Sequence, residues 1–169
     1  MRKFLFMATD VRLSNRSIKR PDASFKIRRP QIPVPPPVWL KLQPNGHPYP
    51  NLVVEVTVNH EGPQKLRDDM QRYFTRRTSI RVWIGVKYWM AGRKFWVGWA
   101  ERRPNGVGGT LHTQMDWPPN HHDINVATNI VYNIPMATIY GPNIQMPPGL
   151  PPTLDLDTDV IRSTILDEV

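Results

Sequence analysis

Two acidic residues lie in strand-like segments where a divalent cation could bind between them. Glu55 interrupts the apolar run NLVVEVT, and Asp22 begins the segment DASFKI. Side chains alternate across a strand, so Glu55 shares a face with Thr57, opposite the face that the other apolar residues complete. A carboxylate from a neighbouring strand could meet Glu55 there; Asp22 is the candidate, and with the backbone carbonyl of Val56 the pair would form an oxygen-rich site for Mg²⁺ or Mn²⁺. The competing interpretation is that Glu55 is a solvated residue on a half-buried strand.

The surrounding sequence predicts a sheet with helices against it. The expected strands are residues 9–15 and 17–29 as one pair, 51–58, 79–90 and 94–103 as a hairpin, and 124–134, with a strand passing into a terminal helix over 152–166. A helix beginning at Pro63 is expected because proline suits the first helical position and Leu66, Met70, Tyr73 and Phe74 form an apolar stripe. Residues 104–110, PNGVGGT, indicate a loop. This order of elements points to an α/β or α+β domain with a mixed sheet.

Length and composition favour one domain over residues 1–169. With 169 residues, of which 40% are hydrophobic, the chain can form one core and hardly two. The proline-rich stretch 30–50 is expected to be a connector whose Trp39 packs back on the domain. The apolar run at the start is too short for a signal peptide or a membrane span, and the absence of Cys fits a reducing compartment. We therefore expect an intracellular protein, cytoplasmic or nuclear, with no membrane association.

The charge balance makes polyanions plausible partners. The net charge is +8 and the sequence pI is near 10.1, with the excess in the N-terminal half and an acidic tail. Basic charge of this size raises the affinity for nucleic acid through counterion release, so any DNA binding should be mostly electrostatic. The aromatic strand 94–103, with Arg102 and Arg103 at its end, is consistent with base stacking, although aromatic residues in a hairpin more often form the core.

Four short motifs follow one another along the chain, and their order is a stronger signal than any one of them: PDASF, YPNLVVEV, KLRDDMQRYF and TLDL. In this order they resemble the PD-(D/E)xK restriction-endonuclease-like superfamily, and more narrowly the restriction endonuclease domains found in many filamentous fungi. The likeness is best over residues 20–90. It implies an αβββαβ core with a mixed β-sheet flanked by helices, and it places Asp22 and Glu55 at the metal-binding positions. The implied function is Mg²⁺-dependent hydrolysis of phosphodiester bonds, with DNA the expected nucleic acid.

The sequence departs from this family at the lysine. The family has Lys two residues after the Glu, where this chain has Thr57, which offers no charge to a transition state. The resemblance suggests Lys65 on the following helix as the replacement, so that the catalytic residues would be Asp22, Glu55 and Lys65. The alternative is that Lys65 only forms an i, i+4 ion pair with Asp69. The N-terminal segment before Asp22, which is helical in the family, is also shorter here, so we expect an N-terminally short domain. The alternative function is a catalytically inactive module that binds nucleic acid or has no retained function.

Histidines near these segments are weaker candidates. His121 and His122, followed by Asp123, resemble a zinc motif, but adjacent histidines point apart on a strand, and we expect a solvated loop. His60 is expected near the candidate site, and Gln64 could orient a water at the same edge.

Overall fold

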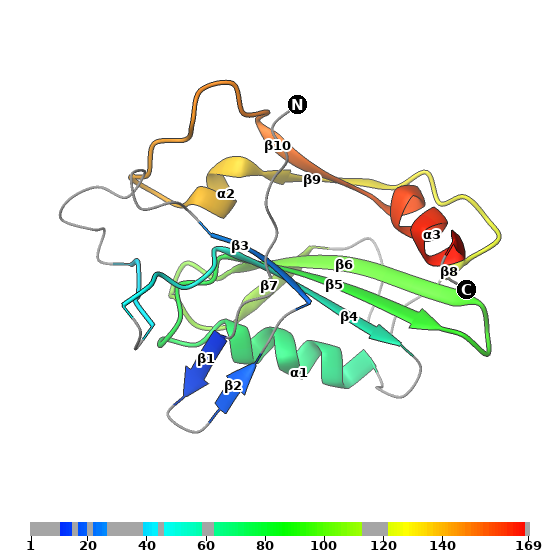
Figure 1. The fold of residues 1–169 in the computed structure, drawn as a ribbon, viewed down its shortest axis with the longest axis horizontal. Helices are drawn as coiled ribbons and strands as arrows, with labels where there is room; N and C mark the ends of the chain where they lie inside the picture. Colours follow the sequence, from blue (N-terminus) through cyan, green and yellow to red (C-terminus); the bar gives the residue numbers. More distant parts are fainter. Residues whose placement is uncertain are drawn as a thin grey trace.

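The computed structural model describes residues 11–14, 17–19, 22–26, 39–43, 46–58, 63–112 and 122–167 (Figure 1). The strands are β1 (Val11–Ser14), β2 (Ser17–Lys19), β3 (Ala23–Phe25), β4 (Leu52–Val58), β5 (Val82–Trp89), β6 (Lys94–Arg102), β7 (Gly109–His112), β8 (His122–Asp123), β9 (Val131–Pro135) and β10 (Thr153–Asp157). The helices are α1 (Pro63–Tyr73), α2 (Met136–Tyr140) and α3 (Thr158–Asp167). None of the helices described is long and apolar enough to cross a membrane.

The central sheet is mixed, as the sequence predicted. Its six strands run in the order β3-β4-β5-β6-β7, with β8 also paired to β6, while β1–β2 and β9–β10 form separate two-stranded sheets. Only β4 and β5 are parallel among the described strand pairs. Parallel neighbours need a crossover connection, and α1 begins at Pro63 between them, as expected. The fold is therefore α+β, with a mostly antiparallel sheet and helices packed against it.

The helix α1 covers one face of the sheet (Figure 1). Its expected apolar stripe is confirmed, because Leu66, Met70, Tyr73 and Phe74 are all buried. These side chains pack with Val53 of β4, Trp83 of β5 and Trp96 of β6. Since alternate strand residues share a face, Glu55, Thr57 and Lys87 lie on this α1 side as well.

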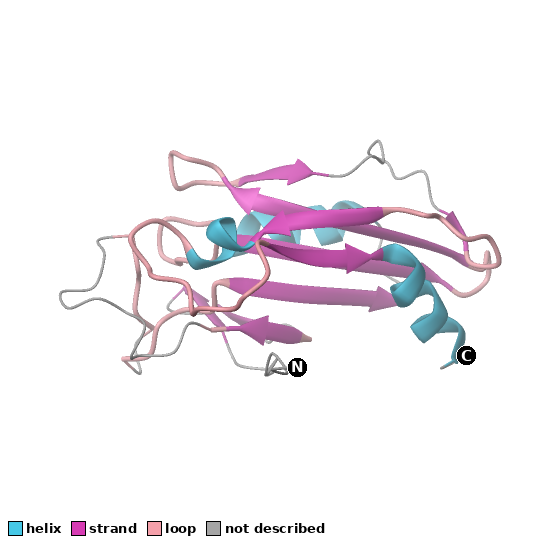
Figure 2. Ribbon diagram, turned by 90° about the horizontal axis from the view of Figure 1, so that it is seen from above, coloured by secondary structure: helices cyan, strands magenta, loops and turns pink. Residues whose placement is uncertain are grey.

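The opposite face is covered by the C-terminal part of the chain, as Figures 1 and 2 show. The antiparallel pair β9–β10, α2 and α3 contribute to two clusters of buried apolar residues there. Leu52, Ile84 and Val97 are examples from the central strands. The expected strand followed by a terminal helix is confirmed as β10 and α3.

Three local predictions were wrong. The expected strand over 17–29 is two strands, of which β2 pairs with β1 and β3 pairs with β4. The sequence between them contains a proline, which cannot donate a ladder hydrogen bond, so one continuous strand is disfavoured. The expected loop 104–110 already contains the start of β7, and the expected strand over 124–134 is shortened to β9, which α2 follows.

The connector is described only in part. Trp39 packs back on the domain as expected: its indole N–H donates to the Pro142 carbonyl at 3.0 Å, and the Arg81 guanidinium lies 5.2 Å from its ring centre. Residues 27–38 and the N-terminal residues 1–10 lie outside the described part of the chain.

Candidate functional site

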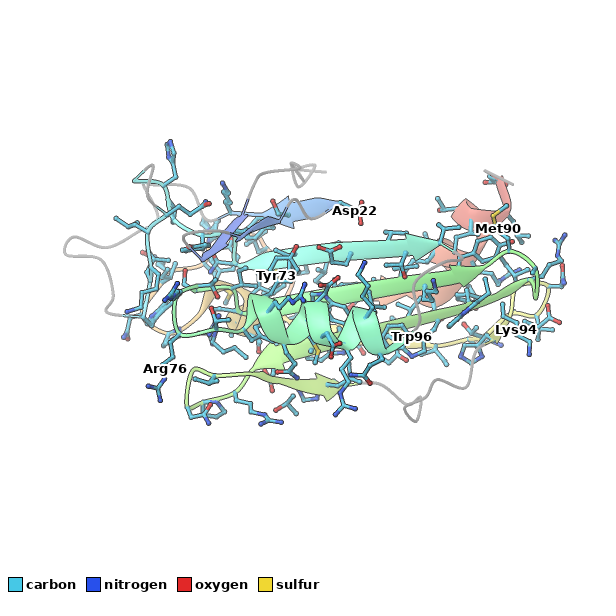
Figure 3. The ribbon with its side chains drawn as sticks, turned by 90° about the horizontal axis from the view of Figure 1, so that it is seen from below. Asp22, Tyr73, Arg76, Met90, Lys94 and Trp96 are labelled. Carbon is cyan, nitrogen blue, oxygen red and sulfur yellow. The ribbon has the colours of Figure 1, made fainter. Side chains whose placement is uncertain are left out.

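The structure brings Asp22 and Glu55 to facing positions on adjacent strands. β3 and β4 are antiparallel with Ala23 opposite Val54, so Asp22, immediately before β3, lies opposite Glu55. The Val56 backbone N–H donates to Asp22 Oδ2 at 2.6 Å, which holds the Asp22 carboxylate against β4. Figure 3 views the α1 side of the sheet with Asp22 labelled beside β4. We predict that the two carboxylates approach each other to within about 4–6 Å, and the use of the Val56 carbonyl as a ligand also stays a prediction.

Glu55 is buried, so the solvated interpretation is wrong. Its side chain is 7% exposed, and Glu55 Oε1 accepts a hydrogen bond from the hydroxyl of Tyr73 on α1, which is fully buried. Burial, this hydrogen bond, and the charges of Glu55, Asp69 and Asp22 raise the pKa of Tyr73 far above its usual range. The Tyr73 hydroxyl therefore stays protonated, donates to Glu55 and lies in a field of three carboxylates.

The third carboxylate, Asp69, belongs to α1. It is 3% exposed and forms an ion pair with Arg72 at 3.4 Å. Lys65 lies on the exposed side of the same helix, and neither role suggested for it by the sequence is tested by this placement. The Gln64 amide donates to Asp68 at 2.8 Å, and His60 lies outside the described residues.

A lysine that the sequence analysis missed lies beside Thr57. β4 and β5 are parallel with Glu55 opposite Gly85 and Thr57 opposite Lys87. Lys87 therefore shares the face of Glu55 and Thr57, one strand away from the position where the family has its lysine. A signal was present in the sequence, because Lys87 is a charge within an apolar strand, as Glu55 is. The register with Thr57 was not visible there.

Lys87 is buried without a hydrogen-bond acceptor. Its side chain is 1% exposed, and within the described part of the chain its Nζ has no partner. Nζ lies 5.5 Å from the ring centre of Trp89, and burial lowers the pKa of Lys87. The hydroxyl of Thr57, which is 8% exposed, also has no partner among described residues. An ammonium buried without an acceptor is costly. The two neighbouring donors, Lys87 Nζ and the Thr57 hydroxyl, are therefore suited to bind the anionic group of a ligand.

Two tryptophans form an apolar surface next to these polar groups. Gly85 and Gly98 face each other on β5 and β6. The rings of Trp83 and Trp96 lie over them, so that a Cβ on Gly85 would come within 2.1 Å of the Trp83 ring. Because Gly85 is also opposite Glu55, the carboxylate has an indole close by. A low local dielectric strengthens the effect of each nearby charge.

The donor set fits a hard divalent cation held with few protein ligands. Asp22 and Glu55 supply carboxylate oxygens, each already held by a hydrogen bond from the protein. No group of three or more acidic, His or Cys side chains able to hold a metal occurs in the described residues. Mg²⁺ in phosphate-processing sites commonly takes one or two carboxylates together with waters and substrate phosphate, which matches this pair.

His122 is not in a solvated loop, which corrects the expectation for this residue. His122 belongs to β8, is half-buried, and its ring centre lies 5.8 Å from that of Phe95. Burial lowers the pKa of His122, and the charge of Asp159 opposes this shift. Asp123 is exposed and accepts from the Asn125 backbone N–H at 2.8 Å, and His121 lies outside the described residues.

Arg102 has a structural role at the end of α1, which argues against base stacking. Its guanidinium donates to the carbonyls of Ile80 at 2.6 Å, Gly106 at 2.7 Å and Thr75 at 2.9 Å, and lies 5.5 Å from the Phe74 ring centre. The aromatic residues of β6 are buried, so the core interpretation of this strand is confirmed.

No family model matches the chain, and no curated protein and no solved structure matches it. The resemblance to the PD-(D/E)xK superfamily therefore stays a prediction.

Proposed function

We propose that this chain is a Mg²⁺-dependent nuclease with a restriction-endonuclease-like fold, with DNA the expected substrate. Asp22 and Glu55 are the metal ligands, and Lys87 supplies the positive charge that Thr57 lacks. The observation that carries the proposal is the parallel register of β4 and β5, in which Lys87 is the direct neighbour of Thr57 on the Glu55 face.

Two hydrogen bonds hold the acidic ligands in place. The Val56 N–H fixes Asp22, and the Tyr73 hydroxyl fixes Glu55. Fixed ligands reduce the reorganisation that accompanies substrate binding. A bound divalent cation would activate a water and neutralise phosphate charge at this site.

Lys87 and Thr57 would bind the phosphate. An ammonium in a site shielded from water stabilises the charge that develops on phosphoryl oxygens in the transition state. The Thr57 hydroxyl can donate to a second oxygen of the same group. This role explains why both donors are buried without a partner in the described residues.

The test is a comparison of lysines in a cleavage assay with Mg²⁺ or Mn²⁺ on duplex DNA, single-stranded DNA and RNA. Lys87→Met should lower the cleavage rate by about 100-fold, the usual loss when a transition-state donor is removed. Lys65→Ala is the matched control and should keep the wild-type rate. Thr57→Lys on the Lys87→Met background places an ammonium on the Glu55 face and should restore part of the activity. Full activity of Lys87→Met together with loss of activity in Lys65→Ala would show that Lys65 on α1, and not Lys87, supplies the catalytic positive charge.

A catalytically inactive nuclease-fold module is the second candidate. Within the described residues, Asp22 and Glu55 each already accept a hydrogen bond from the protein, and no third acidic ligand joins them in a metal-binding group. Paramagnetic resonance of added Mn²⁺ separates the two candidates. Wild-type protein that binds no Mn²⁺ and cuts no nucleic acid would be the inactive module, whereas Mn²⁺ binding that Glu55→Gln abolishes supports the nuclease.

A further inference from the structure

The outer side of α1 and the turns next to its C-terminal end carry a group of exposed arginines. We call this group the basic surface; its members are Arg67, Arg72, Arg76, Arg77 and Arg103. Arg103 comes from the turn after β6, yet it lies close to the end of α1. The backbone N–H of Gly108 donates to the Phe74 carbonyl at 2.7 Å, and the backbone N–H of Arg103 donates to the Gly108 carbonyl at 3.1 Å. The basic surface therefore joins two segments that are distant in the sequence.

Little of this charge is neutralised within the protein. Arg72 pairs with Asp69, whereas Arg67, Arg76, Arg77 and Arg103 form no ion pair with any described residue. The one exposed carboxylate of α1, that of Asp68, accepts a hydrogen bond from Gln64. Four guanidinium groups thus remain available to a polyanion.

The basic surface adjoins the candidate site through α1. Tyr73 points inward to Glu55, and its neighbour Arg72 lies on the exposed side of the same helix. Figure 3 shows α1 in front of the sheet, with Tyr73 on it and Arg76 beyond its end. A polymer bound along the outer side of α1 could therefore continue to the edge of the sheet where Asp22 lies.

The chemistry favours a phosphate backbone over a lipid surface. A guanidinium binds phosphate oxygens in a bidentate manner. α1 has 11 residues, and a helix of this length measures about 16 Å, enough to span more than one phosphate of a nucleic-acid strand. Membrane-binding helices place large apolar side chains beside their cations, and no exposed large hydrophobic residue described lies on α1.

We propose that the basic surface is the nucleic-acid-binding surface of this protein and contacts the phosphate backbone without reading bases. The inference rests on the proposed function for the choice of nucleic acid as the partner. The place of binding, along α1 and the turns beside its end, does not depend on the proposed function.

The experiment measures binding of a fluorescent duplex DNA by anisotropy in EDTA, where cleavage does not occur, as a function of salt concentration. Arg76→Gln/Arg77→Gln should lower the slope of log K against log salt by about 1.8, since each lost phosphate contact removes about 0.9. The matched control is Arg93→Gln/Lys94→Gln, which removes the same charge from the β5–β6 turn. Figure 3 shows Lys94 at the opposite end of the molecule from Arg76. The control should keep the wild-type slope, and thermal unfolding verifies that both variants fold.

Equal losses in the two variants would mean that binding follows net charge, and the proposal would be overturned. It would also be overturned if Arg76→Gln/Arg77→Gln lost binding to phosphatidylserine vesicles while keeping its affinity for DNA. The proposed function is judged separately, by cleavage with Mg²⁺. If the slope falls in Arg76→Gln/Arg77→Gln but not in the control, and the wild type cleaves no nucleic acid, the binding surface is supported and the nuclease is contradicted. If the wild type cleaves nucleic acid and the two variants have equal slopes, the nuclease is supported and the binding surface is contradicted.

Discussion

Two cationic side chains on neighbouring strands, the half-buried Arg102 and the buried Lys87, have opposite surroundings. Arg102 on β6 donates to several backbone carbonyls and, at 2.7 Å, to the Thr78 hydroxyl, whereas Lys87 on β5 has no acceptor within the described residues. Burial and the charge of Arg81 lower the pKa of Arg102 to about 10, so it stays charged at neutral pH. A fully bonded cation stabilises the fold, while one without acceptors costs stability and suggests a ligand. The difference separates a structural region at the end of α1 from the proposed phosphate-binding region at Lys87.

Removing Arg102 should have the largest effect on stability. Arg102→Gln leaves several carbonyls at the end of α1 with fewer donors, and we expect a loss of about 3 kcal/mol in the free energy of unfolding. Urea denaturation followed by circular dichroism measures it. The neighbouring Arg103→Gln is the control, and as an exposed substitution it should stay within about 0.5 kcal/mol. Equal small losses in both variants would mean that the Arg102 hydrogen bonds contribute little.

Removing Lys87 should change stability in the opposite direction. Lys87→Met keeps the length of the side chain and eliminates a buried charge, so we expect a gain of about 1 kcal/mol while cleavage is lost. The same urea experiment, paired with the cleavage assay, tests both effects on one protein preparation. A destabilised Lys87→Met would show that Lys87 has acceptors that the comparison with Arg102 omits.

A third titratable group, the half-buried His122, should give the smallest effect. Its pKa is lowered from 6.5 by burial, so the folded protein favours the neutral ring. This contribution to stability is complete above the unfolded pKa and is lost as the pH falls through the lower folded value. The free energy of unfolding should therefore decrease on acidification from about pH 7.5 to about pH 5. His122→Gln should reduce that decrease, and an unchanged pH profile would contradict the assignment.

Local sequence patterns predicted the elements around the candidate site. Strand alternation placed Glu55 and Thr57 on one face, and both are buried on the α1 side. Pro63 and the apolar stripe predicted α1, including Tyr73, because both signals act within a few residues. Asp22 was offered as the carboxylate that could meet Glu55 from a neighbouring strand, because two carboxylates can share a cation, and β3 does pair with β4.

The sequence by itself therefore determined which residues face together within one strand or helix, and it left the partners across strands open. Only the tertiary structure decided that β4 and β5 are parallel with Thr57 opposite Lys87, and that Tyr73 donates to Glu55. Register between strands depends on which apolar faces pack together over the whole sheet, and a shift by one residue would move Lys87 to the other face. Lys65 was a candidate because the resemblance suggests a lysine on the helix after Glu55, whereas Lys87 lies beside Thr57 because α1 connects β4 to its parallel neighbour β5.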